Sequence, residues 1–93
     1  MRFMANSRPA DGVTPEQLTV YFENNGVSSE AWELVRNHVV TDYAFKIGEP
    51  RGVVLFLRAD SEDEARNFVD STPIVEQGLL RFDVEPLGSV MHL

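Results

Sequence analysis

The sequence predicts one α+β domain whose elements follow the order strand, helix, strand, strand, helix, strand. Three patterns predict this order: apolar residues at helical spacing, strict apolar–polar alternation, and an apolar run, Val53–Leu57, that is typical of a buried strand. The chain has 93 residues, 43% of them hydrophobic and 25% charged. A chain of this length builds one modest core, so we expect residues 1–93 to form a single domain.

Turn residues mark the first strand and the helix that follows it. Residues 2–7 predict a short strand, and the Pro and Gly within Arg8–Gly12 predict a turn after it. Thr14 is suited to be a helix N-cap, with Pro15 at the first helical position and Gln17 three residues after the cap. The apolar face of this helix consists of Leu18, Tyr21 and Phe22.

A second helical stretch follows, with Ser28 or Ser29 as its cap. Its apolar face consists of Val27, Ala31, Leu34, Val35 and His38, with Trp32 beside it. Asn25-Gly26 favours a break between the two stretches, because Asn and Gly accept the left-handed conformation of a helix end. A single kinked helix over residues 15–38 is the alternative.

The middle of the sequence predicts a pair of strands. Residues 42–47 alternate, with Tyr43, Phe45 and Ile47 on one face. Gly48–Gly52 is rich in turn residues and predicts a hairpin connection. Val53–Leu57 is apolar on both faces, which is typical of a strand at the centre of a sheet that is covered on both sides.

The last helix and strand also have clear boundaries. Ser61 and Glu64 fit a capping box, and Pro73 cannot continue the helix that they begin. A final alternating strand covers residues 80–85 and is expected to stop at Pro86. The resulting order is the ferredoxin-like βαββαβ arrangement, a four-stranded antiparallel sheet with helices on one face.

One helical layer covers only one face of such a sheet. Val54 and Phe56 fall on the other face, and a large exposed apolar patch marks an interaction surface. We therefore expect a homodimer in which a second subunit covers this face.

Composition excludes several classes of function. Asp and Glu number 15 against 8 Lys and Arg, a formal net charge of −7 that argues against nucleic acid and anionic membranes as partners. The chain has no Cys and only two His, far apart in sequence, so we expect neither a metal site nor a disulfide. It shows no nucleotide-binding fingerprint, no membrane span and no apolar leader, so we expect a cytoplasmic protein without a cofactor.

Several segments resemble the muconolactone isomerase-like family. They are Trp32–Leu34, Val39–Val40, Tyr43–Lys46, Pro50–Leu55, Ala59–Arg66, Thr72–Val75, Gly78–Leu80 and Phe82–Leu87. The resemblance implies a dimeric α+β barrel that can assemble further into a ring of dimers. It also implies an enzyme that moves a double bond in an unsaturated lactone without cofactor or metal.

The candidate catalytic residues are His38 and Tyr43. The pKa of histidine lies near neutrality, which suits a general base, and the Tyr43 hydroxyl can donate to a substrate oxygen. A histidine at a helix C-terminus also interacts favourably with the helix dipole, and this alternative needs no ligand. His92, near the end of the chain, is either part of a frayed tail or closes a neighbour's pocket.

The candidate binding residues are aromatic or basic. Tyr21 and Trp32 are expected to form the walls of an aromatic pocket, with ordinary core packing as the alternative. Arg36 or Arg58 is a candidate for binding a substrate carboxylate, and exposed ion pairs are the alternative. Together these residues predict a cavity between the helices and the sheet near Trp32 and Tyr43.

The leading functional hypothesis is a cofactor-free isomerase. Its substrate would be a small unsaturated lactone, organic acid or polyketide-like molecule, and its reaction would begin with removal of a proton next to a carbonyl. Two alternatives stay open: a non-catalytic module for ligand binding or assembly, and a cofactor-independent monooxygenase or cyclase on the same barrel.

Overall fold

The computed structural model describes residues 1–25, 33, 37, 39–48 and 50–88. Its elements are β1 (Arg2–Pro9), α1 (Pro15–Asn25), β2 (Val40–Phe45), β3 (Val53–Arg58), α3 (Glu62–Asp70), α4 (Pro73–Glu76) and β4 (Leu80–Leu87). This confirms the predicted order of strands, with one short helix, α4, between α3 and β4 that the sequence analysis does not predict. The choice between one kinked helix and two over residues 15–38 lies outside the described residues.

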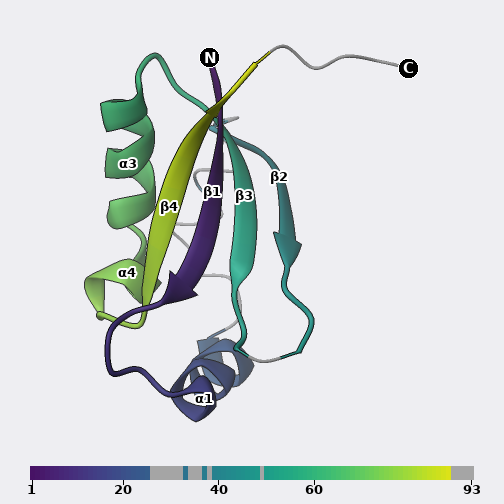
Figure 1. Cartoon of the computed structure of the whole chain (residues 1–93), viewed down its shortest axis with the longest axis vertical. Helices are drawn as coiled ribbons and strands as arrows, with labels where there is room; N and C mark the ends of the chain where they lie inside the picture. The colour runs from purple at the N-terminus through teal and green to yellow at the C-terminus, as the bar shows by residue number, and fades with distance from the viewer. Residues whose placement is uncertain (26–32, 34–36, 38, 49, 89–93) are drawn as a thin grey trace.

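The strands form one antiparallel sheet in the order β2-β3-β1-β4 (Figure 1). The two central strands are β3, as its apolar run predicts, and β1. Phe3 lies opposite Leu57 on one side and Pro86 on the other. The fold is thus the ferredoxin-like α+β arrangement that the sequence predicts.

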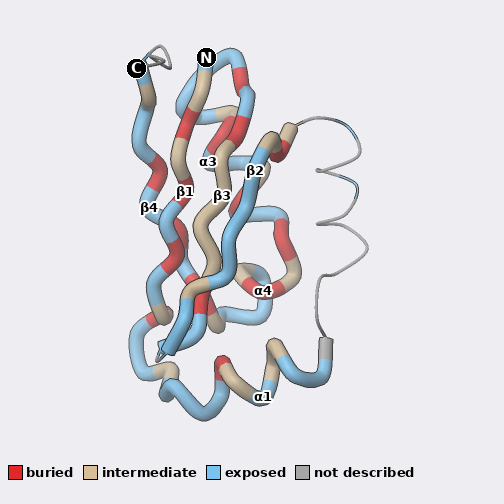
Figure 2. The backbone as a smooth tube through the Cα atoms, turned by 90° about the vertical axis from the view of Figure 1, so that its right-hand side faces the viewer, coloured by how far each residue is buried: buried red, intermediate tan, exposed pale blue. Residues whose placement is uncertain are grey.

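One face of the sheet, here called the inner face, packs against α3. Phe3, Ala5 and Ser7 alternate into it from β1, and all are buried. They meet Val69 of α3 and Leu57 of β3, both almost completely buried. Figure 2 shows buried stretches, in red, on the strands and on the helices that pack against them. Each large apolar side chain that is fully buried there stabilises the fold by about 1.5–3 kcal/mol.

The predicted helix starts form as hydrogen-bonded caps. The Gln17 amide N–H donates to Thr14 Oγ1 at 3.3 Å, and the Thr14 N–H donates to Gln17 Oε1 at 2.8 Å. Ser61 caps α3, where its hydroxyl accepts from the Glu64 N–H at 3.1 Å. The Glu64 carboxylate accepts from the N–H of Asp60 rather than from that of Ser61. Both helices therefore begin where the sequence predicts.

Some element boundaries differ from the prediction. The strand predicted at residues 42–47 occupies Val40–Phe45, because Val40 pairs with Leu57 ahead of a bulge. The first strand continues to Pro9, and β4 does not stop at Pro86 but runs on to Leu87. Proline is tolerated in β4 because this strand lies at the edge of the sheet, where β1 is its one neighbour among the described strands.

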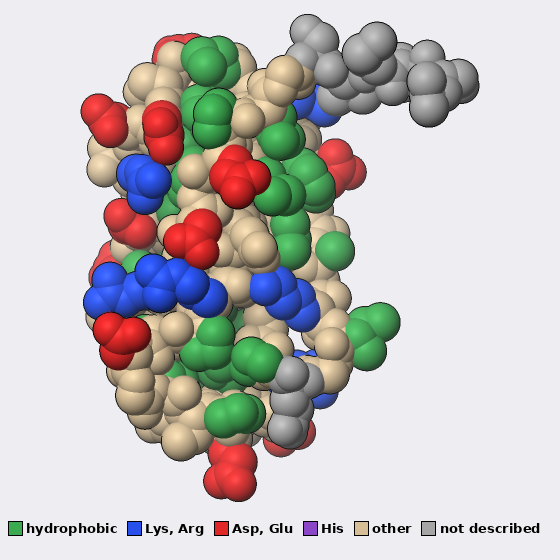
Figure 3. Space-filling view, viewed as in Figure 1, with side chains coloured by type: hydrophobic (Ala, Val, Ile, Leu, Met, Phe, Trp, Pro, Cys, Tyr) green, Lys and Arg blue, Asp and Glu red, His purple; other side chains and the backbone are tan. Residues whose placement is uncertain are grey.

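The second face, here called the outer face, carries a half-buried apolar centre with charged residues around it. Its centre consists of Met4, Val54 and Phe56. Its basic residues are Arg2, Arg8, Arg58 and Arg81, and its acidic residues are Asp42, Asp83 and Glu85. Figure 3 looks onto this face, with acidic side chains above a row of basic ones.

Candidate functional site

Four aromatic side chains make a continuous edge-to-face chain, here called the aromatic series. Tyr21 meets Phe22 at a ring-centroid distance of 6.0 Å, and Phe22 meets Phe45 at 6.1 Å. Phe45 meets Tyr43 at 5.8 Å. The interplanar angles lie between 80° and 89°, the T-shaped geometry that aromatic quadrupoles prefer. The series joins α1 to β2.

The aromatic series lies on the inner face, at the β2 side of the sheet. Tyr43 is directly opposite Leu55, and Phe45 is opposite Val53. Helix α1 sits at the end of the sheet and brings Phe22 to Phe45 (Figure 1). Tyr43 is 42% exposed and Phe45 48% exposed, so both rings keep accessible surface. Such a surface can bind a flat unsaturated ring, and the Tyr43 hydroxyl can donate to an oxygen on it.

Two predicted site residues, Tyr21 and Tyr43, belong to the aromatic series. The two rings between them belong to residues that the sequence analysis did not select as site residues. Tyr21 and Tyr43 are linked by Phe22 and Phe45. Two sequence patterns could have identified Phe22 and Phe45. Phe45 lies two residues after Tyr43 and so on the same face of the strand, and Phe22 lies on the apolar face of α1. The predicted residues outside the described part of the chain are Trp32, Arg36, His38 and His92.

Arg58 lies on the other face of the sheet from Tyr43. It follows Leu57, which points inward, and it lies directly opposite Arg2 on β1. Arg58 lines an open hollow of about 600 Å³ at the end of the sheet, together with Asp60 and Glu64. Arg58 and Tyr43 therefore leave their strands on opposite faces of the sheet.

A second open hollow, of about 510 Å³, lies beside β4. Arg8, Arg66 and Arg81 line it together with Asp70 and Asp83. Two of these arginines already have carboxylate partners, since Arg8 pairs with Asp83 at 3.3 Å and Arg66 pairs with Glu62 at 3.3 Å. Neither hollow includes a member of the aromatic series. The larger one is lined by Asn37 and Val39, on either side of His38, and the cavity expected near Trp32 and Tyr43 stays a prediction.

Residues 1–25, 33, 37, 39–48 and 50–88 contain neither a cluster of metal ligands nor a membrane-spanning helix. In this part of the chain no three His, Asp or Glu side chains come together as metal ligands would. None of its helices has the length and apolar character needed to cross a membrane.

Fold and site together define a small ferredoxin-like α+β domain with an accessible aromatic surface. A similar solved structure is that of 5-chloro-2-hydroxyhydroquinone dehydrochlorinase (TftG) from Burkholderia phenoliruptrix AC1100, in complex with 2,5-dihydroxybenzoquinone. The TM-score is 0.69 and the sequence identity 21%, over 95% of this chain and 94% of that chain. This likeness shows a shared fold.

No family model matches the chain, and no curated protein matches its sequence. The likeness to TftG supports the α+β fold that the resemblance to the muconolactone isomerase-like family implies. The dimeric barrel and membership of that family stay predictions.

Proposed function

We propose that this protein is a cofactor-free isomerase of a small unsaturated lactone, organic acid or polyketide-like molecule. The observation that carries the proposal is the aromatic series, which offers an apolar surface ending at the Tyr43 hydroxyl. Apolar walls with a few polar groups are typical of small-molecule sites. The likeness to TftG supports this ligand class, because that enzyme was solved with a dihydroxylated quinone bound.

The proposed reaction moves one proton within the substrate. A base takes a proton from the carbon next to a carbonyl, and the electron pair that remains forms an enolate. The Tyr43 hydroxyl donates a hydrogen bond to the enolate oxygen, where negative charge develops. The protonated base then returns the proton to another carbon of the conjugated system, which shifts the double bond without an oxidant or reductant. The proposed base is His38, on the sequence grounds given above.

We also propose that the working unit is a homodimer formed through the outer face. Phe56 and Val54 remain only half-buried in the single chain, together with Met4. A second subunit on this face would complete their burial, and a stable interface needs at least about 1,000 Å². Acidic Glu85 lies on the same face as basic Arg58, so the charges on the face can pair across a two-fold axis.

The test is a screen of lactones and aromatic acids, first by thermal shift and then by turnover. We expect Tyr43→Phe to lower turnover while it keeps the ring and ligand binding. We expect His38→Ala to lower turnover by about 10²–10⁴-fold, the usual contribution of a general base. If compounds bind but none is turned over, the result would contradict the proposed isomerase activity and favour a ligand-binding module. Turnover that consumes oxygen would favour the monooxygenase.

A further inference from the structure

The two edges of the sheet are built differently. Strands β2 and β4 lie at the edges, so each presents one row of backbone N–H and C=O groups that no other strand of the described sheet pairs. Such an edge is a template for another strand, and proteins normally protect it.

The β4 edge carries the usual protection. Pro86 removes one donor from the strand, and Arg81, Asp83 and Glu85 are charged and exposed. Helix α3 also lies alongside this strand (Figure 1). A second chain would therefore meet a poor template at β4.

The β2 edge lacks these features. All four residues from Asp42 to Phe45 are exposed, and the exposed side chains Tyr43, Phe45 and Ile47 alternate along one face. Lys46 could guard this edge, but its ammonium turns away across the sheet and donates to the Ser7 carbonyl at 2.6 Å. Figure 2 looks onto this edge, with β2 in front and exposed along most of its length.

We propose that β2 pairs with β2 of a second copy, antiparallel and centred on Ala44. The Lys46 N–H donates to the Gly52 carbonyl, so Lys46 points its backbone groups toward β3. Since the direction alternates along a strand, Ala44 also points toward β3, whereas Tyr43 and Phe45 point their backbone groups outward. In this register Tyr43 of one copy exchanges hydrogen bonds with Phe45 of the other.

The same register is self-complementary in its side chains. Each Tyr43 ring lies opposite the second copy's Phe45, and aromatic cross-strand pairs stabilise a sheet. The two small Ala44 side chains meet on the two-fold axis, where the strands approach most closely. Asp42 lies opposite the second copy's Lys46, so no like charges face each other.

This symmetry about Ala44 favours a second copy over an unrelated peptide. A two-fold axis requires that one patch complement itself, and residues 42–46 do so. The pairing also continues the aromatic series into the second copy, whose Phe45 becomes a neighbour of Tyr43. It uses the free edge of β2 and leaves the outer face open, so it stands independently of the proposed reaction and of the proposed outer-face dimer.

Single-cysteine crosslinking tests the proposal, because the chain has no Cys of its own. In the proposed register, the two residues at position 44 form a non-hydrogen-bonded pair about 4.5 Å apart at Cα, within disulfide reach. We expect Ala44→Cys to form a covalent dimer under mild oxidation at micromolar concentration. The control Asn67→Cys is also exposed, on α3, and reports random collision.

Asn6→Cys distinguishes edge pairing from packing of the outer face. Asn6 lies in the same row as Ala44 through Val54, but two strands further into the sheet. Crosslinking at position 6 with none at position 44 would overturn the proposal. Crosslinking at position 44 no faster than at position 67 would overturn it too.

A proline at the edge gives a second measurement. The Phe45 N–H points away from β3, so Phe45→Pro removes a donor that β3 does not use and that an added strand would. Phe45→Val keeps that donor and suits a strand. We expect sedimentation to show a smaller assembly for Phe45→Pro than for Phe45→Val, with the same helix and strand content by circular dichroism. Equal assembly sizes would contradict edge pairing.

Discussion

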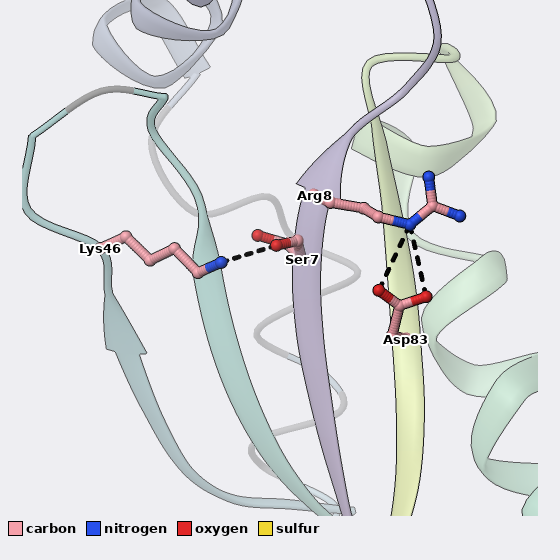
Figure 4. Close-up of polar contacts among 4 residues, drawn as sticks. All are labelled: Ser7, Arg8, Lys46 and Asp83. Carbon is pink, nitrogen blue, oxygen red and sulfur yellow. Dashed lines mark hydrogen bonds and ion pairs between the residues drawn. The ribbon is translucent and has the colours of Figure 1, made fainter.

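The Lys46 ammonium donates a hydrogen bond of 2.6 Å to the backbone carbonyl of Ser7, which joins the end of β2 to β1 across the start of β3 (Figure 4). The β1–β3 register ends at Asn6 opposite Val54. Beyond that point the Ser7 hydroxyl accepts from the Val53 N–H at 2.8 Å. Two side chains thus satisfy backbone groups where the ladder between the strands ends.

Loss of this contact should destabilise the fold. We expect Lys46→Met to lower the free energy of unfolding by about 1.5–3 kcal/mol, the range for hydrogen bonds that involve a charged group. Arg51→Met, at an exposed position in the same connection, is the control and should change stability little. Urea denaturation of both variants checks the prediction. Equal stabilities would mean that the contact contributes nothing.

Gly52 and Ser7 should be energetically coupled. A Cβ added at Gly52 would lie 2.5 Å from Ser7 Oγ and 3.2 Å from Lys46 Cδ, so Gly52→Ala forces a shift and should destabilise. Ser7→Ala should cost about 1–3 kcal/mol by leaving the Val53 N–H without its acceptor. In a double-mutant cycle, Gly52→Ala should cost less in the Ser7→Ala background, because the nearest atom is gone. Additive costs would argue against a direct steric contact.

The α3 cap offers a local test. We expect Ser61→Ala to destabilise by about 0.5–2 kcal/mol, since the Glu64 N–H loses its side-chain acceptor. Ser61→Asp keeps an acceptor and should retain most of the stability. Thermal unfolding of the two variants compares them directly. A Ser61→Ala melting temperature equal to that of the Asp variant would rule out the cap as a stabilising contact.

Substitutions of Leu57 and Phe56 should distinguish packing within the core from packing between subunits. Leu57 is completely buried, so Leu57→Ala should cost about 2–5 kcal/mol at any protein concentration. Phe56 lies on the outer face, so Phe56→Asp should chiefly weaken the proposed dimer. Sedimentation should then show more monomer for Phe56→Asp than for wild type. A wild-type protein that is monomeric at micromolar concentration would contradict the outer-face dimer.

Much of the fold could be predicted from the sequence because its signals are local. The cap at Ser61 and the apolar run of β3 each require only neighbouring residues, and the structure confirms both. The extension of β4 through Pro86 was missed because it depends on the strand's place at the sheet edge. The short helix α4 was missed because Pro73 was interpreted as a stop, whereas it begins the new helix at its first position.

The candidate site was harder to predict because it depends on which face each strand presents. Val53–Leu57 is apolar on both faces, so its pattern does not show on which side Arg58 emerges. The register of β1 against β3 decides this and places Arg58 away from Tyr43. The contact between Phe22 and Phe45 joins a helix to a strand far along the chain, and no local pattern contains such a contact.

The position of β1 between β3 and β4 also constrains how the protein folds. Arg2 lies opposite Arg58 on one side and Leu87 on the other, so the first strand pairs only with segments made much later. Contacts between residues so distant in sequence slow folding, because a long loop must close before they form. During synthesis β1 therefore stays unpaired until β3 has left the ribosome, and its second side stays unpaired until β4 has followed.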